Sequence, residues 1–223
     1  MTGREAFLER VRQATAAGTR AGTSAPLPER GNLSYQGAGA EPVARFQQEL
    51  IASGGVSHSA RDVASARGMI ADLVQGSAGR RVLLGRGTVI DALDLAPRLR
   101  ERGVEVVVTD SHDANRDALF AADVGISGVA YLVAETGSVV AATAPEEPRS
   151  LTLLPPVHIA VASRSQILPD LFDLFARFAS SPPALPSCLT IITGPSKTGD
   201  IELRLVTGVH GPGEVHVVLL DSV

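Results

Sequence analysis

Residues 81–110 read RVLLGRGTVIDALDLAPRLRERGVEVVVTD. The segment opens with the apolar run 81–84, continues with a helical pattern over 92–102, and ends with the apolar run 104–109 before Asp110. Short apolar runs separated by one helix are typical of parallel strands covered by helices. The segment therefore predicts a β-α-β unit.

The alternation continues on the amino-terminal side and beyond this unit. One helix is expected at 43–52 and another near 115–122. Between them, Ser59–Asp62 resembles a capping box, so a further helix is expected to begin after it. Apolar runs at 130–134 and 139–142 lie too close together for an intervening helix and predict a hairpin. The first half thus indicates a doubly wound α/β arrangement, with a parallel sheet covered on both faces.

Near the carboxyl end, three more strands and one helix are expected. The strands are 157–161, 188–192 and 215–220. Between the first two, a strongly amphipathic helix carries Phe172, Phe175 and Phe178, and this spacing predicts core positions for the three rings.

The amino-terminal segment differs in composition from the rest. Residues 3–18 predict an amphipathic helix, and residues 18–42 are rich in Gly, Ser, Ala and Pro without periodicity. We expect residues 1–42 to form an amino-terminal helix and a flexible linker, and residues 43–223 to form one α/β domain.

Composition excludes several classes of protein. A net charge of −4 and a pI near 5.7 argue against a nucleic-acid binder. Cys188 is the one cysteine of the 223 residues, so the chain alone forms no internal disulfide and holds no four-cysteine iron-sulfur cluster. Without a signal-like start or eighteen consecutive apolar residues, we expect a cytoplasmic protein with no membrane span.

Gly85-Arg86-Gly87 follows a predicted strand and precedes a helix, as in a dinucleotide-binding turn, and Asp110 ends the next strand. Ile90 occupies the place of the third glycine. Two glycines at a strand-to-helix turn are common for steric reasons, and we favour that interpretation.

Lys197 is the only lysine of the chain, and the other nineteen of the twenty lysine and arginine residues are arginines. It lies in a loop, 193–200, of Gly, Pro, Ser and Thr that follows an apolar run. Backbone amides and the hydroxyls of Thr193, Ser196 and Thr198 could form an anion nest around Gly194, with Lys197 supplying the charge. The alternative is an ordinary solvated lysine.

Two further residues are candidates for proton transfer. Glu135 stands between two apolar runs, where desolvation would raise its pKa, although a Glu that pairs with Arg or caps a turn is an equal alternative. His210 lies in the glycine-framed loop Val209–Gly213. Asp200 and Glu202 are two residues apart, so on an extended segment both would face the same side. Two carboxylates alone are weak support for a metal site, and we expect no metal.

Four ordered motifs carry a family resemblance: AETGS at 134–138, LPPVHI at 154–159, TGPSKTGDIE at 193–202 and GVHGP at 208–212. Over about residues 43–223 the chain resembles the lactate utilisation (LUD) domain family. The family typically has Thr at position 138 and Ala at 199, and it accepts Arg at 197. That tolerance favours a cationic anchor over a Schiff-base lysine.

The resemblance implies a fold related to glucosamine-phosphate deaminase, ribose-phosphate isomerase and the CoA transferases: an open, mainly parallel sheet with helices on both faces. It also implies an accessory role in a system that oxidises L-lactate to pyruvate. Iron-sulfur clusters are then expected on partner proteins, and no cofactor on this chain alone.

In this interpretation a small anion binds at one rim of the sheet, with Glu135 and His210 as tentative catalytic groups. The expected ligand-binding residues are Thr136, Gly137, Ser138, Thr193, Gly194, Ser196, Lys197, Thr198, Asp200 and Glu202. The alternatives are a stand-alone transferase or isomerase acting on an acyl-CoA or a sugar phosphate, by fold analogy, and a protein-binding scaffold.

Overall fold

The computed structural model describes residues 3–18, 37–110, 114–180, 186–199 and 205–221. The chain separates into two units, Met1–Tyr35 and Gln36–Val223. The first contains the expected helix, α1 (Gly3–Gly18), whose Phe7 and Val11 are exposed. Most of the predicted linker, 18–42, lies outside the described residues.

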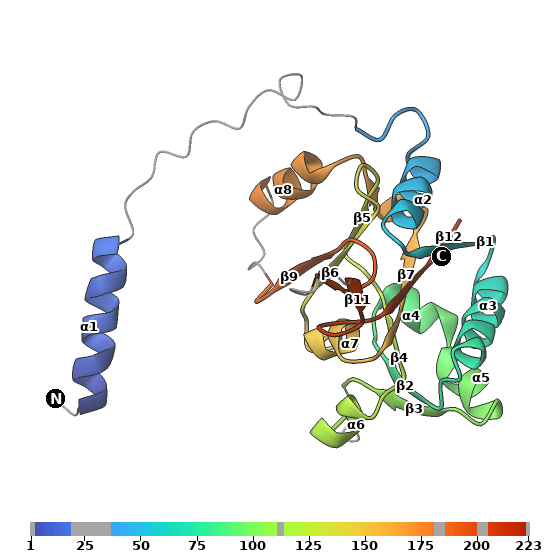
Figure 1. The fold of residues 1–223 in the computed structure, drawn as a ribbon, viewed down its shortest axis with the longest axis horizontal. Helices are drawn as coiled ribbons and strands as arrows, with labels where there is room; N and C mark the ends of the chain where they lie inside the picture. Colours follow the sequence, from blue (N-terminus) through green and yellow to red (C-terminus); the bar gives the residue numbers. More distant parts are fainter. Residues whose placement is uncertain (1–2, 19–36, 111–113, 181–185, 200–204, 222–223) are drawn as a thin grey trace. The chain divides into compact units, whose positions relative to one another are not determined.

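The second unit is built on a six-stranded parallel sheet (Figure 1). Every neighbouring pair in this sheet is parallel. The strands, in spatial order, are β1 (Val56–Ala60), β12 (Glu214–Leu220), β7 (Val157–Ser163), β4 (Val124–Ser127), β2 (Arg81–Leu84) and β3 (Glu105–Val108).

Helices cover the sheet on both faces, which confirms the predicted fold class. On one face, α3, α4 and α5 pack over a core that includes Ile70, Leu93 and Leu99. On the other face, α2 contributes Phe46 and Leu50, and α7 contributes Leu151. The helices of this unit are α2 (Pro42–Ala52), α3 (Val63–Gly76), α4 (Thr88–Leu93), α5 (Leu95–Glu101), α6 (Arg116–Phe120), α7 (Arg149–Leu153) and α8 (Leu171–Ser180), with a 3-10 turn at Arg164–Gln166.

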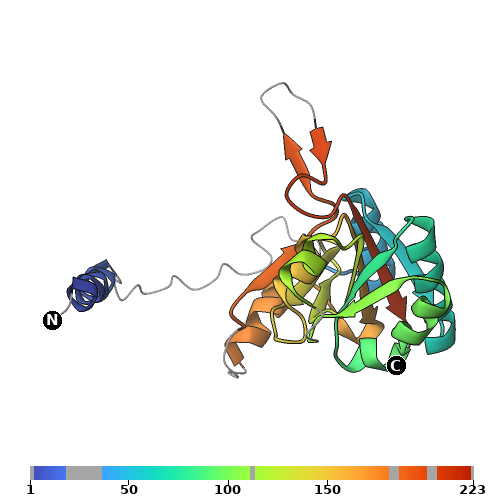
Figure 2. The same cartoon turned by 90° about the horizontal axis from the view of Figure 1, so that it is seen from below.

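A second, four-stranded sheet packs beside α2 on that other face. Its order is β8 (Ile167–Leu168), β5 (Tyr131–Val133), β6 (Ser138–Ala142) and β9 (Leu189–Ile192). Strands β5 and β6 are antiparallel, as the predicted hairpin requires. A further antiparallel pair, β10 (Lys197–Gly199) and β11 (Leu205–Thr207), projects from the body of this unit (Figure 2).

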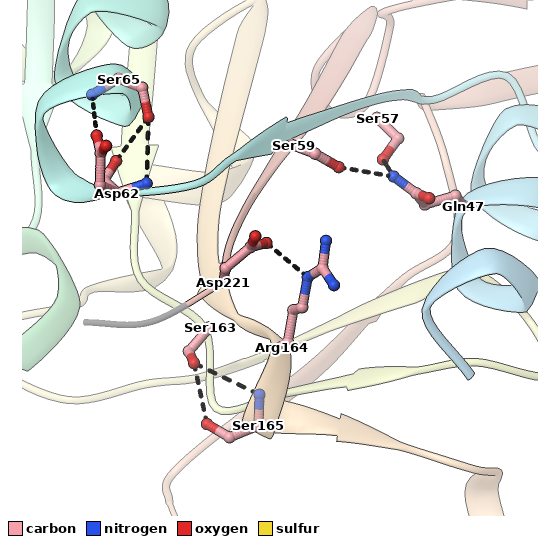
Figure 3. A network of polar contacts seen from close by, with 9 residues as sticks. All are labelled: Gln47, Ser57, Ser59, Asp62, Ser65, Ser163, Arg164, Ser165 and Asp221. Carbon is pink, nitrogen blue, oxygen red and sulfur yellow. Dashed lines mark hydrogen bonds and ion pairs between the residues drawn. The ribbon is translucent and has the colours of Figure 1, made fainter. Parts of the chain in front are cut away.

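The predicted capping box at Ser59 is wrong by three residues. Ser59 lies in β1, where its hydroxyl accepts a hydrogen bond from the Gln47 side chain of α2 (Figure 3). The box is formed instead by Asp62, whose carboxylate accepts the Ser65 amide at 2.7 Å while the Asp62 amide donates to the Ser65 hydroxyl. The predicted core position is also wrong for Phe175, which is 52% exposed, whereas Phe178 packs against a buried cluster that includes Leu174.

Strand β4 and helix α7 approach unusually closely at Gly125. A Cβ atom at this position would lie 2.1 Å from the carbonyl oxygen of Leu151, which is backbone and has little freedom to move. Both elements are buried around this point, with Leu151 fully inaccessible. Only glycine therefore fits between strand and helix here.

Gly125→Ala is expected to lower the free energy of unfolding by about 2–4 kcal/mol, because the added methyl group overpacks a backbone contact. Gly68→Ala is the matched control, since its Cβ would meet no atom within 4 Å outside its own helix, and it should raise stability by ~0.5–1 kcal/mol. Urea unfolding of the three proteins measures both effects. Equal stability of the Gly125→Ala variant and the wild type would contradict the close contact.

One imidazole is buried within the main sheet. His158 on β7 is fully inaccessible, and its Nε2 lies 2.9 Å from the Ser127 hydroxyl on β4. Its Nδ1 is buried and has no hydrogen-bond partner among the described residues. Burial, and secondarily the neighbouring His216, lowers the pKa of His158 to about 4. The ring is therefore neutral at pH 7.

Because the folded-state pKa of His158 lies below its unfolded value near 6.5, the associated stability is complete above pH 6.5 and falls as the pH drops toward 4. Between pH 7.5 and 5 the wild type should lose about 2 kcal/mol more than His158→Gln, which cannot titrate. Urea unfolding at the two pH values measures this difference. Parallel losses in both proteins would show that His158 is not a buried neutral ring.

Candidate functional site

The main sheet contains one point at which the chain reverses its direction of travel. From β2 the chain passes outward to β3 at the edge, and then crosses back to β4 on the other side of β2. The two connections leave the carboxyl ends of β2 and β4 on diverging paths. In open α/β sheets, ligands bind in the crevice that such a reversal creates.

A cavity of about 270 Å³ lies at this point and is called the switch-point cavity below. Arg86 on the loop after β2 and Thr88 at the start of α4 line it on one side, and the loop after β4 lines it with Gly128 and Ala130. Glu147 contributes a carboxyl group. The ionisable side chains among the described lining residues are those of Arg86 and Glu147.

The Glu147 carboxyl group is inserted between the ends of the two strands. Its Oε1 accepts a hydrogen bond of 2.8 Å from the Gly128 amide. A Cβ atom at Gly85 would lie 2.7 Å from the same oxygen, and one at Gly128 would lie 3.2 Å away. Glycine at these two positions therefore makes room for the carboxyl group.

A tight turn holds Glu147 in this place. The Ala144 and Glu147 backbones exchange two hydrogen bonds, of 3.2 and 3.1 Å. The Thr109 hydroxyl, just after β3, donates to the Glu146 carbonyl at 2.7 Å and ties the turn to the sheet. Burial raises the pKa of Glu147 to about 7, although the Gly128 amide favours the charged form. The group is thus divided between its two protonation states near neutral pH.

Arg86 lies on the loop of the partial dinucleotide motif. Its Nε is 3.1 Å from Oδ1 of Asp91 and 4.0 Å from Oδ2 of Asp110. Asp110 therefore faces a guanidinium. Ile90, at the position of the missing third glycine, is a buried core residue. These contacts agree with the steric interpretation of Gly85 and Gly87.

The predicted site residues lie elsewhere, and some of them meet. The Ser138 hydroxyl is 2.7 Å from both the Thr136 hydroxyl and the Thr193 hydroxyl, so β6 and the end of β9 are joined by a chain of three hydroxyl groups. Ser138 is 1% exposed. Gly137 has a φ of 64°, and a Cβ there would lie 2.2 Å from the Leu50 amide nitrogen of α2.

Lys197 contacts the carboxyl end of α2. Its Nζ donates to the carbonyl oxygen of Ser53, the C-cap residue, at 2.5 Å. A Cβ at Gly194, whose φ is 77°, would lie 2.5 Å from the same carbonyl oxygen. A cation at a helix carboxyl end is favourable, because the last carbonyl groups carry partial negative charge.

The loop around His210 joins the Lys197 loop through backbone contacts. The Ser196 amide donates to the Pro212 carbonyl at 2.8 Å, and the Gly208 amide donates to the Ser196 carbonyl at 3.0 Å. The His210 side chain is exposed.

The structure describes two of the remaining four predicted site residues, Glu135 and Thr198. The backbone of half-buried Glu135 donates to the Pro169 carbonyl at 3.0 Å, and Thr198 pairs with Val206 in the projecting hairpin. Asp200 and Glu202 lie outside the described residues.

None of the predicted site residues that the structure describes lines the switch-point cavity. Sequence reasoning missed Glu147, because Pro145-Glu146-Glu147-Pro148 reads as a solvated turn. Within the described ranges, no group of three or more His, Cys, Asp or Glu side chains is placed to hold a metal ion. In the same ranges, no helix has both the length and the apolar character needed to cross a bilayer.

Comparison with solved structures gives the same fold. A crystal structure of a DUF162 family protein from Deinococcus radiodurans aligns with a TM-score of 0.56 over 82% of this chain and 98% of that chain. The sequence identity is 21%, so this likeness concerns the fold alone.

Comparison with known sequences identifies the family. Lactate utilization protein C of Halalkalibacterium halodurans is 33% identical over 156 residues, 69% of this chain and 68% of that protein. The Bacillus subtilis protein of the same name is 32% identical, over 56% and 60%, and the uncharacterized protein YkgG of Escherichia coli is 35% identical, over 63% of each. The LUD domain model matches residues 43–220, and the chain therefore belongs to the LUD domain family.

Proposed function

We propose that this chain acts in lactate utilisation, as an accessory subunit of an iron-sulfur system that oxidises L-lactate to pyruvate. The observation that carries the proposal is the similarity, over most of the α/β domain, to relatives named Lactate utilization protein C. The matched stretches span 60% to 68% of those two relatives, so the activity of the whole system is part of the proposal.

The proposed division of labour follows from cysteine content. Cys188 directly precedes β9 and is half-buried, and its Sγ lies 3.7 Å from the Thr190 hydroxyl. A single thiolate cannot replace the four ligands of a usual iron-sulfur cluster. In this proposal, electrons from lactate leave through clusters on partner proteins, and this chain contributes binding or assembly.

A small anion at the Lys197 loop is a second part of the proposal. The loop brings together Thr193, Gly194, Ser196 and Lys197, and Thr193 connects it to Ser138. The ammonium group of Lys197 is exposed and retains two N–H groups besides the one that donates to Ser53. Anion binding and helix capping are thus compatible at this residue.

Deletion of the gene is expected to abolish growth on L-lactate as sole carbon source and leave growth on pyruvate unchanged. Purified partner proteins should reduce an electron-acceptor dye with L-lactate only when this chain is added. Full dye reduction without the chain would refute the accessory role. Turnover of acyl-CoA or a sugar phosphate by the chain alone would favour the stand-alone alternative instead.

Lys197→Met is expected to lower the melting temperature, because the helix α2 loses its capping cation. If the loop also binds an anion, inorganic phosphate should stabilise the wild type and Lys197→Arg in a thermal-shift titration and should not stabilise Lys197→Met. The arginine variant separates charge from amine chemistry. If phosphate stabilises Lys197→Met as much as the wild type, anion binding at this loop is contradicted, and helix capping is left as the function of Lys197.

A further inference from the structure

The switch-point cavity offers two charged groups and an otherwise mostly apolar wall. Arg86 enters from the loop after β2, and Glu147 enters from the turn before α7. The wall between them is formed largely by Val89, Ile90, Val129 and Ala142. Small-molecule sites usually consist of a mostly apolar pocket with a few polar groups.

Another polar side chain at the cavity, that of Gln166, is already used by the fold. The Gln166 amide donates to the Val129 carbonyl at 2.5 Å, and its oxygen accepts the Ser163 amide at 2.8 Å. Arg86 and Glu147 differ from Gln166 in this respect. The structure gives no hydrogen bond, among the described residues, to Oε2 of Glu147 or to the terminal nitrogens of Arg86.

The volume limits the occupant to a small molecule. About 270 Å³ corresponds to roughly nine water molecules at ~30 Å³ each. This is close to the lower end of the range of about 300–1,000 Å³ typical of drug-sized sites, so a whole dinucleotide or a whole acyl-CoA would extend outside the cavity. A compact acid of a few carbons fits inside.

We infer that the switch-point cavity binds a small 2-hydroxy- or 2-oxocarboxylate, with the ligand carboxylate on Arg86 and its neighbouring oxygen on Oε2 of Glu147. The choice of this acid class rests on the proposed function. The site itself rests on the sheet reversal, the cavity and the position of the two side chains.

Binding of such an anion couples to a proton. Two negative charges in one low-dielectric cavity repel each other, so the ligand favours the protonated form of Glu147. Because Oε1 already accepts the Gly128 amide, the proton taken from solvent resides on Oε2 and is donated to the ligand oxygen. Arg86 is the other charged lining group, and it pairs with Asp91 and Asp110, which are not among the lining residues.

Isothermal titration calorimetry of the purified full chain with sodium pyruvate and with sodium L-lactate tests the inference. Buffers of different ionisation enthalpy should reveal net proton uptake at pH 7. With a Glu147 pKa of about 7, affinity should fall about 30-fold between pH 6 and pH 8.5. Glu147→Gln imitates the protonated carboxyl group, so it should bind without proton uptake and with little dependence on pH.

Neighbouring residues supply matched controls. Glu146→Gln makes the same charge change on an exposed side chain of the same turn, and it should retain the pH dependence of the wild type. Arg86→Gln should weaken binding about tenfold or more, because a charge-assisted contact is lost, while Arg149→Gln should not. Circular dichroism spectra establish that each variant is folded.

Two results would overturn the inference: no saturable binding of either acid to the wild type, or the same pH dependence in Glu147→Gln as in the wild type. Each differs from failure of the proposed function. If the deletion strain cannot grow on L-lactate but Glu147→Gln keeps the pH dependence of the wild type, the cavity is refuted and the function stands. If the deletion strain grows normally, the function is refuted while acid binding at the cavity can still be measured.

Discussion

The domain depends on burying both faces of one parallel sheet. On β12, Val217 and Leu219 face the core shared with α2 and the second sheet, whereas Val218 and Leu220 face the core beneath α3. Parallel sheets occur almost only where both faces are covered, because their connections pass over those faces. The two cores therefore stabilise the same strands from opposite sides, and helices or strands missing from either side would expose a continuous apolar surface.

The same constraint confines polar chemistry to the strand ends. Within the sheet, His158 and Ser127 form a buried polar pair through Nε2 of the imidazole, while its Nδ1 has no partner among the described residues. At the carboxyl ends, the reversal between β2 and β4 separates two loops that would otherwise pack together. Glu147 occupies part of that space, and the cavity is the remainder. The location of ionisable groups is thus a result of topology.

Much of the fold follows from apolar patterns along the chain. The runs 81–84 and 104–109 predict β2 and β3 because each contains three consecutive apolar residues, Val82–Leu84 and Val106–Val108. The same patterns do not predict β1 and β4, because Val-Ser-His-Ser-Ala and Val-Gly-Ile-Ser carry polar or small residues. These residues are placed by contacts with other elements. The serines of β1 contact Gln47, and Gly125 of β4 contacts Leu151. Glu147 was unpredictable for the same reason. Its environment is created by Gly85 and Gly128, which lie 62 and 19 residues before it in the sequence.

Two loops, the turn at Gly137 and the Lys197 loop, share a single partner in this molecule, the last turn of α2. Gly137 rests on Leu50, while Gly194 and Lys197 both contact Ser53. Substitutions at these positions therefore cannot act independently. Once one substitution has displaced the turn, a second substitution breaks fewer remaining contacts. The loss in free energy of unfolding for a double substitution is therefore smaller than the sum of the two single losses. We therefore expect substitutions at 137, 194 and 197 to be energetically coupled to substitutions at 50–53.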